Sequence, residues 1–219
     1  MTGYTPAITT LVIACGASLA MGNIVTNGGF EDASGPTTAS GWNHIATAPG
    51  SSSASSTRST AMPAAGDAHL ALSVTGAADG GPLAEAQFQT ALFSITPGVG
   101  YDLSLLAKRV DPLGVGIVTG FEVQWLDSDG SAGGGVRGST GFFGFGGDLT
   151  ENYEAFGFSN QIAAPDSDAA LVIIRLVGGA IPDTAGTVYV DNVSLTVVPA
   201  PGTLAAAGLL GLAGLRRRR

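Results

Sequence analysis

The stretch FEVQWL at Phe121–Leu126 decides the fold class, because its side chains alternate between apolar and mostly polar types. Successive side chains of an extended strand point to opposite faces. Phe121, Val123 and Trp125 therefore share one apolar face, and the opposite face carries Glu122, Gln124 and Leu126. The Asp129-Gly130 pair that follows favours a tight hairpin turn, since glycine adopts positive φ freely. The segment predicts a half-buried β-strand.

Further segments carry the same signal. They are rich in β-branched or alternating apolar residues and read YDLSLLAKR (101–109), ALVIIRLVGG (170–179) and TVYVDNVSLTVV (187–198). No segment shows a convincing amphipathic helix. Strands separated by glycine- and proline-containing turns are typical of sandwiches and jelly rolls. The sequence therefore predicts one all-β, jelly-roll β-sandwich domain over residues 23–197.

The charge of the chain is unevenly distributed. The 219 residues have a formal net charge of −8, and all 17 acids lie between Glu31 and Asp191. Residues 23–198 contain only five bases, so this stretch has a net charge of −12. A phosphate backbone would be repelled by such a body, which makes nucleic acid an unsuitable partner.

The N-terminal segment 1–22 has the pattern of a signal peptide. Residues 7–22, AITTLVIACGASLAMG, are apolar and end in small residues, which fits cleavage after Ala20 or Gly22. A second interpretation uses Val12–Cys15 as a lipoprotein cleavage box, with Cys15 carrying the lipid. Both interpretations predict export.

The C-terminal segment 198–219 has three parts. A Pro-x-Pro-Gly motif at Pro199, Pro201 and Gly202 precedes an apolar run over 203–215, and the chain closes on Arg216, Arg217, Arg218 and Arg219. A 13-residue helix covers only about 20 Å of a hydrocarbon core of about 30 Å. The arginines favour the cytoplasmic side, which leaves the upstream chain outside.

This order of parts resembles the PEP-CTERM sorting signal of bacterial surface proteins, although Ala200 stands where the usual middle residue is glutamate. The resemblance implies a transient inner-membrane anchor and cleavage near the Pro-x-Pro-Gly motif by an exosortase-type processing enzyme. The protein would then pass to the cell surface or extracellular matrix. An ordinary short anchor is the alternative.

The body between these ends resembles the galactose-binding-type jelly roll of carbohydrate-binding modules. The most specific segments are NGGFE (27–31) and VDNVSL (190–195). The resemblance implies a structural Ca²⁺ site, because the first and last strands of this fold lie side by side. Its ligands would be the Gly29 carbonyl, the Glu31 and Asp191 carboxylates, and an oxygen near Asp67. These are hard oxygen ligands of the kind that Ca²⁺ takes.

A carbohydrate site needs an aromatic surface together with amides and carboxylates. The candidates are Glu122, Gln124, Trp125, Phe142, Phe143 and Tyr153. Trp125 alternates in phase with Phe121 and Val123, which favours the core over a sugar platform.

The sequence lacks the Gly-x-Ser-x-Gly and His-Glu-x-x-His motifs of common hydrolases. We therefore expect a secreted, non-catalytic protein that is a structural or adhesive module of an extracellular polysaccharide matrix. The first alternative is a lectin-like module with a defined glycan ligand. A glycan-active enzyme is the second.

Overall fold

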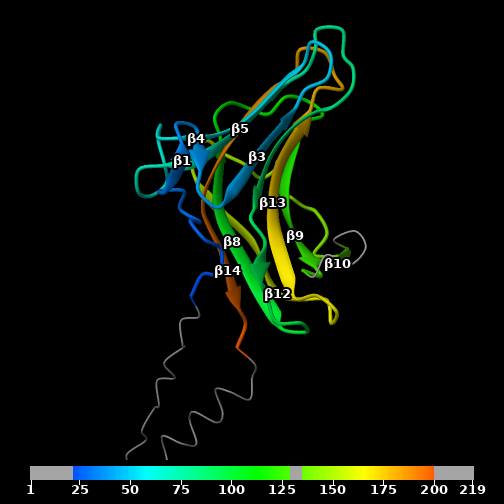
Figure 1. The fold of residues 1–219 in the computed structure, drawn as a ribbon. Coiled ribbons are helices and arrows are strands. Elements are labelled where there is room, and N and C mark those ends of the chain that lie inside the picture. The colour runs from blue at the N-terminus through cyan, green and yellow to red at the C-terminus, as the bar shows by residue number, and fades with distance from the viewer. Residues whose placement is uncertain (1–21, 129–134, 200–219) are drawn as a thin grey trace, which may run out of the picture. The chain divides into compact units, whose positions relative to one another are not determined.

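A computed structural model describes residues 22–128 and 135–199 (Figure 1). Their regular structure consists of β-strands, and Gly22–Val198 forms a compact unit. Within the described ranges, no helix has the length and apolarity to cross a membrane. The predicted signal peptide, the Asp129-Gly130 turn, Pro201, Gly202 and Arg216 to Arg219 lie outside the described residues, whereas Pro199 lies within them and is exposed.

One layer of the sandwich is a seven-stranded antiparallel sheet, whose main strands follow the order β10-β9-β13-β6-β3. Two short strands extend it, with β11 paired to β9 and β7 paired to β13. The strands are β3 (Trp42–Thr47), β6 (Ala84–Thr90), β7 (Phe93–Ser94), β9 (Val118–Leu126), β10 (Val136–Ser139), β11 (Phe143–Gly144) and β13 (Ala169–Gly178).

The other layer is a five-stranded antiparallel sheet in the order β12-β8-β14-β5-β4. Its strands are β4 (Ser53–Ser59), β5 (His69–Thr75), β8 (Gly100–Arg109), β12 (Glu154–Ile162) and β14 (Ala185–Val197). A small ribbon pairs β1 (Ala33–Gly35) with β2 (Thr38–Ala39). The chain passes repeatedly from one sheet to the other, so strands that follow one another in the sequence seldom pair. The protein is an all-β jelly-roll sandwich, as the alternating segments predicted.

The core lies between the two sheets and is built from the apolar faces of the alternating strands. Trp125 of β9 is 3% exposed and lies against Tyr101 of β8, with 5.6 Å between the ring centroids. Leu70 and Leu72 of β5 are fully buried on the same inner side. Burial of each such side chain stabilises the folded state by about 1.5–3 kcal/mol, so the core between the sheets is the main source of stability.

The first described segment lies along the last strand. The Ile24 N–H donates to the Leu195 carbonyl at 2.9 Å, and the Val193 N–H donates to the Gly28 carbonyl at 2.9 Å. A Cβ at Gly28 would lie 1.9 Å from the Val193 oxygen, so glycine is required for this close approach. The two ends of the described chain therefore meet at one place in the sandwich.

Candidate functional site

Strand register brings a set of polar side chains onto the solvent side of the seven-stranded sheet. Glu122 of β9 pairs with Ile173 of β13, which pairs with Gln89 of β6. In a neighbouring row Arg175 of β13 pairs with Gln87. These side chains alternate with those of the core and so point away from the space between the sheets, although Ile173 and Gln87 are themselves buried on this side, at 2% and 7% exposed. We call this surface the polar face, made of Glu85, Gln87, Gln89, Glu122, Gln124, Phe142 and Arg175.

Arg175 is the centre of the polar face. Its Nη2 donates to Glu122 Oε1 at 2.7 Å, and its Nε lies 3.9 Å from Glu85 Oε1. Gln124 Nε2 donates to the same Glu122 oxygen at 2.9 Å. Glu122 is thus held by a charge-assisted hydrogen bond from Arg175 and a second hydrogen bond from the Gln124 amide, which together fix the orientation of its carboxylate.

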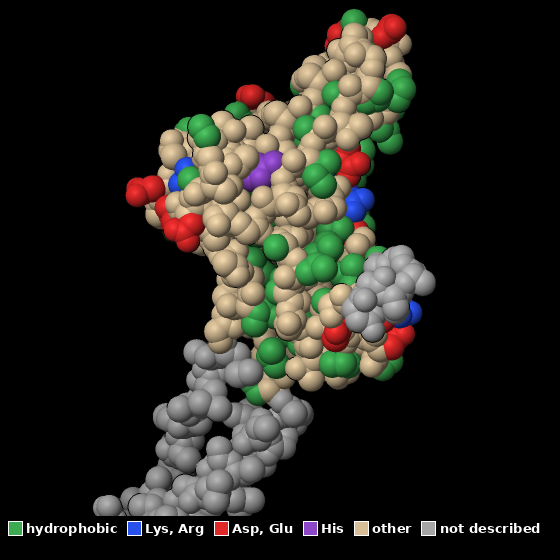
Figure 2. All heavy atoms as spheres, viewed as in Figure 1, with side chains coloured by type: hydrophobic (Ala, Val, Ile, Leu, Met, Phe, Trp, Pro, Cys, Tyr) green, Lys and Arg blue, Asp and Glu red, His purple; other side chains and the backbone are tan. Residues whose placement is uncertain are grey.

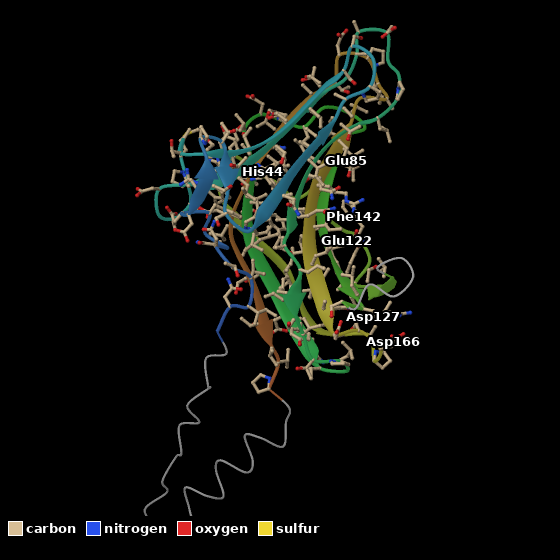
Figure 3. The ribbon with its side chains drawn as sticks, in the orientation of Figure 1. His44, Glu85, Glu122, Asp127, Phe142 and Asp166 are labelled. Atoms are coloured by element: carbon tan, nitrogen blue, oxygen red, sulfur yellow. The ribbon has the colours of Figure 1, made fainter. Side chains whose placement is uncertain are left out.

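Phe142 supplies an aromatic surface beside this network. Its side chain is 42% exposed, and the Arg175 guanidinium carbon lies 6.0 Å from the ring centroid. A Cβ at Gly120 would lie 2.6 Å from Phe142 Cζ, so the missing side chain there makes room for the ring over β9. Figure 3 shows Glu85, Phe142 and Glu122 following one another along β13 and β9. In Figure 2, acidic and basic side chains on this flank adjoin an apolar patch.

Three sequence candidates lie elsewhere. Trp125 is buried in the core, so its candidacy for contact with a sugar was wrong. The reason is the alternation along β9, which buries Trp125 on the same face as Phe121. Phe143 stacks on Phe121 with 5.6 Å between the ring centroids, and its partly buried side chain packs against the hydrophobic core. Tyr153 directly precedes β12 of the other sheet. Its hydroxyl donates to the Met62 carbonyl at 3.2 Å, and Lys108 Nζ lies 4.8 Å from its ring centroid.

The sequence interpretation missed Arg175 and Glu85. Arg175 stands alone inside the apolar run of β13, and an isolated charge there needs a partner. Glu85, Gln87 and Gln89 alternate through AEAQFQT at 84–90, which is the signal of a polar strand face. Both signals were present, but only pairing across three strands shows that they meet.

The predicted metal residues also come together, at the place where the first segment meets β14. Asp191 is fully buried, and its Oδ2 accepts the N–H groups of Ala64 at 2.8 Å and Ala65 at 3.1 Å. Its Oδ1 accepts the N–H of Asn192 at 2.7 Å. Burial raises the pKa of Asp191, the three N–H donors oppose this, and the nearby Glu31 charge adds to the rise.

Glu31 faces the same region. Both its carboxylate oxygens accept the Asp67 N–H at 3.0 Å. A Cβ at Gly29 would lie 4.0 Å from Glu31 Cγ, which places Gly29 in this cluster. Asp67 presents a donor to Glu31 through its backbone, and its side chain is exposed. The described residues contain no group of three or more His, Cys, Asp or Glu side chains able to hold a metal. Two repelling carboxylates suit a cation, but further ligands would have to be backbone oxygens.

Comparison with known proteins places the fold. No family model matches the chain, and no curated protein matches it. The enzymatically active domain of tailspike protein 4 from bacteriophage CBA120 aligns with 80% of this chain at 18% identity and a TM-score of 0.56. This chain spans only 21% of that one.

Two carbohydrate-binding modules are similar at lower scores. One, described as belonging to the β-sandwich superfamily, has 16% identity and a TM-score of 0.48, covering 80% of this chain and 63% of that one. The other, TmCBM61 in complex with β-1,4-galactotriose, has 13% identity and a TM-score of 0.46, covering 80% and 99%. Identities this low concern the fold alone.

Proposed function

We propose that the polar face binds a carbohydrate chain without cleaving it. The observation that carries this proposal is the exposed Phe142 ring beside the Arg175–Glu122–Gln124 network. A sugar has an apolar ring face and a rim of hydroxyls. An aromatic surface next to fixed acceptors and donors satisfies both kinds of contact.

The dimensions of the polar face suit a chain rather than a single sugar. Glu122 and Glu85 lie on β9 and β6, which are separated by β13. Adjacent strands are about 4.8 Å apart and a strand rises about 3.4 Å per residue. Glu122 pairs with Ile173 and Glu85 with Val177, four residues further along β13, so the backbones of the two glutamates are about 17 Å apart on a diagonal of the sheet. Gln87 and Arg175 lie between them in register. Because these groups project from strands instead of loops, little order is lost when a ligand binds.

The arrangement of charge favours binding over hydrolysis. Glycoside hydrolysis requires one carboxylic acid that stays protonated and a second carboxylate that attacks or activates water. Glu122 Oε1 accepts from both the Arg175 guanidinium and the Gln124 amide, so this oxygen is engaged within the protein. We therefore propose a non-catalytic module. Release of reducing ends from a bound glycan would support the enzyme alternative.

A glycan array probed with the purified full chain tests carbohydrate binding, followed by titration of the strongest glycan. We expect Phe142→Ala to lower affinity about tenfold, equivalent to about 1.4 kcal/mol. Ile162→Ala is the matched control, because Ile162 is an exposed apolar residue of β12 on the other sheet. An array with no binding, or equal affinity in Phe142→Ala and the unaltered chain, would exclude this function.

We also propose that the protein is exported, sorted through its C-terminal segment and retained in the extracellular polysaccharide matrix. The apolar segment 7–22, the Pro-x-Pro-Gly motif and the arginine cluster support this proposal. Processing by an exosortase-type enzyme predicts that the mature protein lacks both residues 1–22 and the four arginines. The intact mass of the protein from its own cells measures both cleavages, and a full-length mass would contradict the proposal.

Calcium is a further proposal, in which Ca²⁺ would be held by the Glu31 and Asp191 carboxylates with backbone oxygens such as that of Gly29. Burial raises the pKa of Asp191 and the nearby Glu31 charge adds to the rise, so a dication held by the two carboxylates would offset their repulsion. Asp67 would then position Glu31. The role of the ion would be to fasten the first segment to β14.

A further inference from the structure

The polar face carries an excess of negative charge. In the rows that pair β9, β13, β6 and β3, the charged side chains on the solvent side are Glu85, Glu122 and Arg175 among the described residues. Two carboxylates therefore face one guanidinium. The surrounding body has the net charge of −12 noted above, so no distant positive field compensates for the excess.

The two carboxylates are not equivalent. Glu122 has a side chain that is 13% exposed, and it accepts both Arg175 at 2.7 Å and Gln124 at 2.9 Å. Glu85 is 36% exposed and lies 3.9 Å from Arg175 Nε. In residues 22–128 and 135–199, no hydrogen bond reaches the Glu85 carboxylate. Glu85 is thus an acceptor still open to a ligand.

Arg175 already neutralises one of the two carboxylates, although its Nε has no hydrogen-bond partner among the described residues. Its strongest bond goes to Glu122, and its guanidinium lies near the Phe142 ring. A uronate carboxylate that approached the guanidinium would lie near both Glu122 and Glu85, whose carboxylates are 2.7 Å and 3.9 Å from it. The repulsion between carboxylates a few ångströms apart is unfavourable even at the protein surface.

We propose that the polar face selects its glycan by charge, rejecting carboxylated sugars and favouring chains that carry free amino sugars, with Glu85 as the specificity-determining residue. This inference rests on the proposed carbohydrate binding by the same face. The ammonium of a 2-amino sugar donates to the Glu85 carboxylate, while the sugar ring lies on Phe142. The strength of the bond is that of an exposed ion pair, which corresponds to an affinity gain of about three- to fivefold for each amine engaged.

Three hexasaccharides with one β-1,4 backbone test the proposal: the glucosamine hexamer, its fully N-acetylated form and the C6-carboxylated form of that acetylated hexamer. Titration of the full chain at low ionic strength and about pH 6 keeps the amines charged and the field unscreened. We expect the glucosamine hexamer to bind tightest, the acetylated form about three- to fivefold more weakly, and the carboxylated form weakest.

Glu85→Gln should remove the advantage of the glucosamine hexamer. Glu154→Gln is the matched control, because it removes the same charge from β12 on the other sheet and its amide oxygen can still accept the Thr150 hydroxyl. Loss of the advantage in both variants would show that the charge of the whole body, not Glu85, is responsible, and would overturn the proposal.

Other results also decide the question. Equal affinity for the amine and acetylated forms, or no binding of the glucosamine hexamer, overturns the charge selection but leaves carbohydrate binding standing if the array has found another glycan. Glucosamine binding that survives Phe142→Ala and disappears in 0.5 M salt would overturn both, because it would be non-specific attraction to an acidic body.

Discussion

Replacing Arg175 with methionine removes the centre of the polar face while keeping an apolar stem of similar length. The charge-assisted bond to Glu122, part-buried at 2.7 Å, contributes about 1.5 kcal/mol. The exposed contact with the Phe142 ring adds about 0.5 kcal/mol. The 3.9 Å pair with Glu85 adds only a few tenths. We therefore expect Arg175→Met to lower the free energy of unfolding by about 2 kcal/mol.

Urea unfolding followed by tryptophan fluorescence measures this change, because Trp42 and Trp125 are buried and become exposed on unfolding. A loss of about 2 kcal/mol moves the midpoint by about 1 M for a protein of this size. A double-mutant cycle with Glu122→Gln isolates the pair, and we expect a coupling energy of about 1 kcal/mol. A coupling below about 0.3 kcal/mol would refute the view that Arg175 holds Glu122.

Three other perturbations test other parts of the structure. Gly28→Ala should cost about 2–3 kcal/mol, because its Cβ would overlap the Val193 oxygen, whereas Gly147→Ala, with open space around it, should change thermal unfolding little. Calcium should raise the melting temperature and EDTA should lower it, and Glu31→Gln should abolish the shift; a melting temperature indifferent to both would contradict the calcium proposal. His44 accepts the Ala39 N–H through Nε2 at 3.0 Å, so the ring proton is on Nδ1 and is donated to the Ser56 carbonyl. Burial lowers the pKa of His44 below its usual value of 6.5. The unfolded chain then binds this proton more readily, so stability from His44 is complete above pH 6.5 and is lost as pH falls through the lower folded pKa. His44→Gln should flatten that loss in unfolding curves measured across pH 7.5 to 4.5, and an unchanged slope would contradict the assignment.

The location of the candidate site could be predicted only in part. Glu122, Gln124 and Phe142 were candidates by residue type, and Trp125 was placed in the core by its phase with Val123. Tyr153 was grouped with them only because it is aromatic. Sequence order says nothing of which sheet a strand joins, so the position of Tyr153 next to β12 of the other sheet could not be predicted.

Alternation along the strands determined that the chain is an all-β sandwich, because period-two patterning specifies which side chains leave water whatever the strand order. The meeting of the two ends was predicted only through the resemblance of NGGFE (27–31) and VDNVSL (190–195) to a known jelly roll. The tertiary structure alone decided that Arg175 lies between Glu122 and Glu85. These residues come from β13, β9 and β6, and their contact depends on the register of three strands far apart in the chain. Pairing of that kind is set by the packing of the whole core, which no single segment encodes.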